Sequence, residues 1–200
     1  MNDKKVGLSD TMKAKTEPKS FQKNPIPGTK FTIAISSAKG GVGKSTFATN
    51  LALALKKVGW KDLDFIIVDM PPGTGDTQLT FAQEINVDGA IIISTPQEIA
   101  LQDVKRGIRM FDKLKVNIIG LIDNMSHFIG DDGKKYTIFG ENGVERTAKE
   151  FEKKFLGRIP INADVGKYCD MGIPIVEKDP DHEITKIYLE FAEKVKQSFL

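Results

Sequence analysis

The chain has 200 residues, of which 40% are hydrophobic and 28% are charged, and its formal net charge is +2. This length and composition suit one soluble globular domain, and a near-neutral charge without a basic block argues against a nucleic-acid-binding face. No apolar run approaches the roughly 18 to 20 residues of a membrane span, and the single cysteine excludes an intramolecular disulfide, which favours a cytoplasmic location.

The chain begins with a lysine-rich, polar segment that contains three prolines and almost no apolar periodicity. It has neither the apolar core of a signal peptide nor the arginines of a transit peptide. We therefore predict a flexible polar tail over residues 1–28 and one domain over residues 29–200.

A buried strand over residues 31–36 runs into a glycine-rich loop, Ala-Lys-Gly-Gly-Val-Gly-Lys-Ser-Thr, at residues 38–46. Gly40, Gly41 and Gly43 permit a sharp turn that aims backbone N–H groups at phosphate oxygens, because these residues lack a Cβ. Lys44 then supplies a cation and Ser45 a magnesium ligand. The pattern predicts a phosphate-binding loop followed by a helix that ends near residue 59.

Short apolar strands alternate with amphipathic helices along the rest of the chain. We predict strands over residues 64–69, 89–94, 116–123 and 155–160, and helices over residues 77–85, 98–114, 143–154, 163–171 and 182–198. This alternation predicts an α/β fold: a single P-loop NTPase domain with a mostly parallel sheet of about five strands and helices on both faces.

A second motif lies at the end of the strand that follows the P-loop helix. Asp69 ends this strand, where a magnesium contact belongs, and the run Pro-Pro-Gly-Thr-Gly follows at residues 71–75. Glycine N–H groups in such a loop, including that of Gly73, can approach a γ-phosphate and rearrange when it leaves. These features predict a Walker B aspartate followed by a switch II loop.

Three further segments carry a family resemblance. Lys39 adds a second lysine inside the P-loop, which is the deviant form typical of the MinD, ParA and nitrogenase-iron-protein class. The segment Asp-Met-Pro-Pro-Gly-Thr-Gly-Asp at residues 69–76 closely resembles the signature of the Mrp (ApbC/NBP-type) ATPases, as do residues 95–104 and 120–126. The resemblance covers all of the chain except the tail.

This resemblance implies ATP and Mg²⁺ as cofactors, slow hydrolysis, and a nucleotide-gated homodimer that acts in iron–sulfur cluster assembly or transfer with assembly or recipient proteins. It implies no membrane or nucleic-acid partner. It makes Lys39, Lys44 and Asp69 the catalytic residues and Ser45 and Asp69 the magnesium ligands. The nucleotide-binding residues that it implies are Ala38, Lys39, Gly40, Gly41, Val42, Gly43, Lys44, Ser45, Thr46, Gly73 and Asn124. In this class the lysine at the position of Lys39 reaches the nucleotide of the other subunit. Asn124 matches the position that recognises adenine, and the alternative role of Asn124 is to cap a turn.

The chain departs from the family in its cysteines. Members that bind a bridging cluster usually carry Cys-Pro-x-Cys after the Asn-Met-Ser strand, whereas residues 127–134 here contain no cysteine. Cluster ligation normally uses four thiolates, and a dimer of this chain would offer two. We therefore assign no iron–sulfur ligands and predict that Cys169 is a buried structural cysteine.

A second departure is a gap of several tens of residues between the P-loop helix and the Walker B strand, which removes the switch I aspartate. Two alternative functions therefore stay open: a nucleotide-binding scaffold without hydrolysis, or a ParA/MinD-like positioning ATPase. The gap also predicts that residues 65–68 form an edge strand with exposed apolar surface, which invites association.

Overall fold

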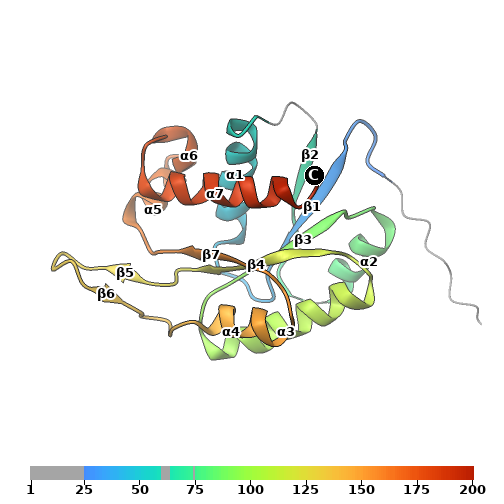
Figure 1. Ribbon diagram of the computed structural model, residues 1–200, viewed down its shortest axis with the longest axis horizontal. Coiled ribbons are helices and arrows are strands. Elements are labelled where there is room, and N and C mark those ends of the chain that lie inside the picture. The colour runs from blue at the N-terminus through green and yellow to red at the C-terminus, as the bar shows by residue number, and fades with distance from the viewer. Residues whose placement is uncertain (1–24, 60–63, 74) are drawn as a thin grey trace, which may run out of the picture.

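The computed structural model describes residues 25–59, 64–73 and 75–200 of the chain. A five-stranded parallel sheet lies at its centre in the order β2-β1-β3-β4-β7 (Figure 1). The strands are β1 (Phe31–Ser36), β2 (Phe65–Asp69), β3 (Gly89–Ser94), β4 (Ile118–Asn124) and β7 (Phe155–Ile159). A short antiparallel hairpin of β5 (Phe128–Ile129) and β6 (Lys135–Tyr136) extends away from the sheet. The parallel α/β architecture with about five strands is confirmed.

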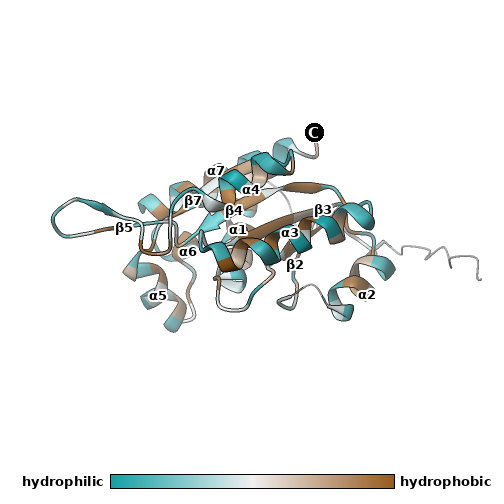
Figure 2. Ribbon diagram, turned by 90° about the horizontal axis from the view of Figure 1, so that it is seen from below, coloured by the Kyte–Doolittle hydropathy of each residue, from teal (hydrophilic) through white to brown (hydrophobic). Residues whose placement is uncertain are grey.

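Helices cover both faces of the sheet. One face carries α1 (Lys44–Lys57), α5 (Ala163–Asp170), α6 (Ile175–Lys178) and α7 (Glu183–Gln197), and the other carries α2 (Asp76–Glu84), α3 (Glu98–Lys113) and α4 (Gly143–Glu150). Each face has its own apolar core, so the three central strands are buried on both sides. Apolar residues run almost without interruption along β3 for this reason (Figure 2).

The contact of α1 with α7 fixes the helix that follows the P-loop. The ring of Phe47 on α1 lies 5.7 Å from that of Tyr188 and 6.1 Å from that of Phe191, both on α7. All three side chains are at least 98% buried. The apolar stripe of the terminal helix therefore packs in the core, as its spacing predicts. Burial on this scale stabilises each aromatic side chain by about 1.5–3 kcal/mol.

The predicted elements have counterparts that agree within a few residues, with two omissions. Helix α6 has four residues, and each strand of the β5–β6 hairpin has two, so neither is long enough to show a periodic pattern. The predicted helix over residues 143–154 ends at Glu150. Residues 1–24 of the predicted tail lie outside the described residues. No helix in the described part of the chain is long and apolar enough to cross a membrane.

Strand β2 lies at an edge of the sheet, as the gap in the sequence predicts. It pairs with β1 along its whole length, and among the described residues it has no strand on its other side. Residues 65–68 are only half-buried. An apolar edge of this kind is open to strand pairing with other chains.

We expect the nucleotide-free protein to self-associate as its concentration rises, and the substitution Ile66→Lys to reduce this association, because a charge on an edge strand opposes pairing. Sedimentation velocity over a concentration series measures the effect. The matched control is Ile138→Lys, since Ile138 is 61% exposed and lies away from the sheet edge. Equal effects of the two substitutions, or a wild-type monomer at every concentration, would contradict the assignment to the edge.

Candidate nucleotide-binding site

The P-loop connects the carboxyl end of β1 to the first turn of α1. Gly41 and Gly43 adopt positive φ angles of 79° and 81°, which place them in the left-handed region, and Gly43 is the N-cap of α1. These conformations open the loop so that the helix N-terminus, with its unpaired N–H groups, faces the end of the sheet. The described loop therefore has the geometry of a phosphate cradle.

Three of the predicted site residues meet beside the carboxyl ends of β1 and β2. Lys44 forms an ion pair with Asp69 through Nζ and Oδ1, and the Ser45 hydroxyl donates to Asp69 Oδ2 at 2.5 Å. The pairing of β1 with β2 brings these residues together across 25 positions of sequence. A hydroxyl and a carboxylate beside a lysine are hard oxygen donors and a cation, so these residues fit Mg²⁺ and phosphate oxygens.

The loop after β2 is tied to the strands beneath it. Gly73, at φ 103°, donates its N–H to the Ser37 carbonyl at 2.9 Å, so in this state the amide is engaged within the protein. The buried Gln78 of α2 donates to the Pro71 carbonyl and accepts from the Ser36 hydroxyl at 3.4 Å. Gln78 therefore anchors the predicted switch II loop, although its position in an amphipathic helix carries no sequence signal for that role.

Asn124, at the end of β4, contacts the P-loop directly. Its Nδ2 donates to the Val42 carbonyl at 2.8 Å. A Cβ built on Gly43 would lie 2.4 Å from the same Nδ2, so the absence of a side chain at Gly43 allows this approach. Asn124 therefore holds the P-loop through its amide, and its role at the adenine base stays a prediction.

Two more predicted site residues are Lys39, in the loop before α1, and Thr46, in the first turn of α1. Lys39 is exposed, and its carbonyl accepts from the Ser37 hydroxyl at 3.1 Å. Thr46 is half-buried, and its Oγ1 lies 3.8 Å from the Sγ of Cys169. The prediction of a buried structural Cys169 is wrong: the residue is exposed, because α5 buries none of its residues and only its half-buried side chains pack against the core.

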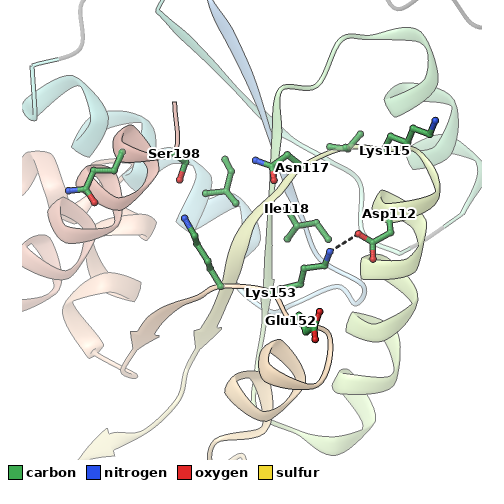
Figure 3. A pocket seen from close by; sticks show the side chains of 11 residues that line it. Asp112, Lys115, Asn117, Ile118, Glu152, Lys153 and Ser198 are labelled. Carbon is green, nitrogen blue, oxygen red and sulfur yellow. Dashed lines mark hydrogen bonds and ion pairs between the residues drawn. The ribbon is translucent and has the colours of Figure 1, made fainter. Parts of the chain in front are cut away.

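Cavities lie beside the loop and at the opposite end of the sheet. One of about 250 Å³ adjoins Ser45, Thr46 and Cys169. Another, of about 580 Å³, opens at the amino end of β4, where the Lys153–Asp112 ion pair of 2.7 Å crosses it (Figure 3). Ligands of parallel α/β sheets bind at the carboxyl ends of the strands, so the first cavity adjoins the candidate nucleotide site and the second lies away from it.

No group of three or more His, Cys, Asp or Glu side chains that could hold a metal ion occurs in residues 25–59, 64–73 and 75–200. Cys169 is the chain's single cysteine. His127 has its pKa lowered, chiefly by burial, and its Nδ1 lies 2.9 Å from the Ser126 hydroxyl.

A parallel sheet, a P-loop and a strand-end aspartate beside it define a P-loop NTPase with the deviant second lysine. A family model described as the ParA-type NUBPL iron-transfer P-loop NTPase matches residues 28–59 and 55–196. The chain belongs to this family.

Individual proteins show the same likeness. An iron–sulfur cluster carrier protein of Aquifex aeolicus is 32% identical over 260 residues, covering 91% of this chain and 71% of that protein. A mitochondrial iron–sulfur protein required for NADH dehydrogenase, from Arabidopsis thaliana, is 44% identical over 146 residues, covering 72% and 47%. A nucleotide-binding protein of Archaeoglobus fulgidus, solved in complex with ADP, is 28% identical with a TM-score of 0.69, covering 77% and 90%.

The comparisons also confirm the gap. The alignment to the Aquifex protein spans 260 positions but draws on 91% of 200 residues, which is 182, so about 78 positions hold residues of the relative alone. The family model matches the chain in two segments, which meet at residues 55–59 near the end of α1. Seven residues, 58–64, separate α1 from β2 in this chain, so the missing segment belongs between the P-loop helix and the Walker B strand.

Proposed function

We propose that the chain binds ATP with Mg²⁺ at the P-loop. The observation that carries this proposal is the convergence of Lys44 and Ser45 on Asp69 at the open end of α1. On binding, Lys44 leaves Asp69 for the β- and γ-phosphates, and the helix N-terminus receives the remaining phosphate charge. Ser45 and Asp69 would hold Mg²⁺, which would neutralise charge on the phosphate oxygens.

We further propose that this nucleotide chemistry serves iron–sulfur cluster assembly or transfer in the cytoplasm, together with assembly or recipient proteins. Membership of an iron-transfer family supports this role, as do the carrier proteins similar to the chain. Because this chain has one cysteine, the cluster ligands come from the partner proteins.

A homodimer completes the proposed site. Lys39 is exposed on the loop, so its side chain is available to the nucleotide of a second subunit. A cation delivered in this way would stabilise charge on the transferring phosphoryl group and couple hydrolysis to the dimer.

The short link between α1 and β2 favours a second candidate function, a nucleotide-binding scaffold without hydrolysis. Seven residues leave no room for the strand and switch I loop that orient the attacking water. Binding of a fluorescent ATP analogue, followed by measurement of phosphate release, separates the two. Binding with turnover supports the ATPase, binding without turnover supports the scaffold, and no binding contradicts both.

Anaerobic reconstitution with iron and sulfide tests the cluster assignment. We expect the purified chain to retain no cluster after desalting, and Cys169→Ser to behave identically, because one exposed thiol per chain cannot supply four ligands. Visible absorption and iron content measure retention. A cluster held by the wild type and lost in Cys169→Ser would show that the chain itself ligates iron.

A further inference from the structure

Strand β4 ends in a buried acid that the proposed nucleotide chemistry does not use. The side chain of Asp123 is 1% exposed and lies in register with Ser94 of β3 and Arg158 of β7. Its Oδ1 has no hydrogen-bond partner among the residues that the structure describes. A buried carboxylate with an unpaired oxygen is costly, and proteins relieve that cost by pairing or by protonation.

The neighbouring cation is engaged elsewhere. Arg158 Nε lies 4.0 Å from Asp123 Oδ2, while its Nη2 donates to Asn142 Oδ1 at 2.8 Å and to Glu145 at the start of α4. The guanidinium also lies over the ring of Phe155, with 4.9 Å between Cζ and the ring centroid. Since 31% of its side chain is exposed, Arg158 is not enclosed by packing on every side, and its Nε is already 4.0 Å from Asp123 Oδ2.

We propose that Asp123 and Arg158 form a proton-controlled latch between β4 and β7. A neutral Asp123 leaves Arg158 bound to Glu145 and Asn142, as in the structure, whereas an ionised Asp123 draws the guanidinium into the sheet. The exchange gives Arg158 two discrete positions, and the proton on Asp123 selects between them.

The charges around Asp123 set the pH at which the latch changes state. Burial is the largest influence and raises the pKa of Asp123 to about 7. Arg158 of β7 lowers this pKa, Glu145 of α4 raises it, and Lys135 of β6 lowers it. The register partner on β3 is Ser94, which carries no charge.

The latch lies next to the residue that holds the P-loop. Asn124 follows Asp123 directly and donates to the Val42 carbonyl at 2.8 Å. An ionised Asp123 adds a negative charge at this strand end and moves a cation beside it. We expect nucleotide to bind more weakly in that state; this consequence rests on the proposed nucleotide-binding function. Linkage then requires bound nucleotide to raise the pKa of Asp123.

A side-chain carboxyl NMR titration of the full chain tests the latch without a variant. Asp123 is expected to titrate with a pKa of about 7, and Glu145→Gln to lower that pKa by about one pH unit, because the freed guanidinium pairs with the carboxylate. The matched control is Glu141→Gln, which removes an exposed acid from the segment before α4. An ordinary aspartate pKa, or no change in Glu145→Gln, would overturn the latch.

Thermal unfolding supplies a second readout. The pKa of Asp123 is higher in the folded state than its value of about 4 in the unfolded state. The stability that protonation of Asp123 contributes is therefore complete below about pH 4. It is lost as the pH rises to about 7. As the pH rises from about 4 to about 7, we expect the unfolding temperature of Asp123→Asn to rise relative to that of the wild type. A constant difference between the two proteins would contradict the latch.

Affinity for MgADP tests the link to the P-loop. We expect the wild-type Kd to weaken about fivefold between about pH 6 and about pH 8, and Asp123→Asn to lose this dependence. His127→Gln is the control for the other group that titrates nearby, and it should keep the wild-type dependence. The same pH dependence in Asp123→Asn would overturn the link. Failure of the wild type to bind either MgADP or MgATP would contradict the proposed function, and the NMR titration would still decide the latch.

Discussion

Lys44→Ala is expected to abolish the stabilisation that MgATP gives to this protein. At a nucleotide concentration about 100-fold above Kd, the wild type should gain about 2.7 kcal/mol, or roughly 5 to 10 °C in unfolding temperature. The gain depends on Lys44 because its side chain, 10% exposed at the start of α1, supplies the cation that is available to the β- and γ-phosphates once it leaves Asp69. Thermal unfolding with and without MgATP measures the effect.

Lys56→Ala is the matched control, because it removes an exposed lysine from the last turn of the same helix. That variant should keep the full MgATP shift, and both variants should keep the wild-type helical content. Equal shifts in wild type and Lys44→Ala would show that nucleotide binds elsewhere. No shift in the wild type would show that the loss of the segment between α1 and β2 has disabled the site.

Most of the fold could be predicted from the sequence, because its strands are continuous apolar runs and its longer helices carry apolar stripes. The edge position of β2 also follows from the sequence, since the short link after α1 removes the segment that would lie outside it. Helix α6 and the β5–β6 hairpin escape prediction because two to four residues are too few for a period to show. Their form depends on tertiary contacts instead.

The site is predictable where the chemistry is local in sequence. The glycine pattern identifies the P-loop, and the sheet then brings Asp69 to Lys44 and Ser45. Contacts between distant segments are not predictable in this way: Asn124 and Val42 are 82 positions apart, and Asp123 became notable only when its burial was known. Exposure of Cys169 was missed because an amphipathic pattern in α5 resembles a packed helix.

The approach of Asn124 to the P-loop predicts a difference in stability between alanine substitutions at two glycines that have nearly the same φ angle. Gly41 and Gly43 have φ angles of 79° and 81°, so alanine at either position costs about 1–2 kcal/mol of left-handed strain. A Cβ at Gly41 meets nothing within 4 Å, whereas one at Gly43 lies 2.4 Å from Asn124 Nδ2. Gly43→Ala must therefore also displace Asn124 and lose its hydrogen bond to Val42, at a further cost of about 1 kcal/mol.

Gly43→Ala is expected to unfold about 2 to 4 °C below Gly41→Ala. The contact with Asn124 is isolated by repeating both substitutions in an Asn124→Ala background, where the displaced side chain is already absent. There the difference between the two glycine variants should disappear, because only the backbone strain that they share remains. If the difference persists without Asn124, the cost at Gly43 comes from the start of α1 itself, and the hydrogen bond between β4 and the P-loop contributes nothing to holding the loop.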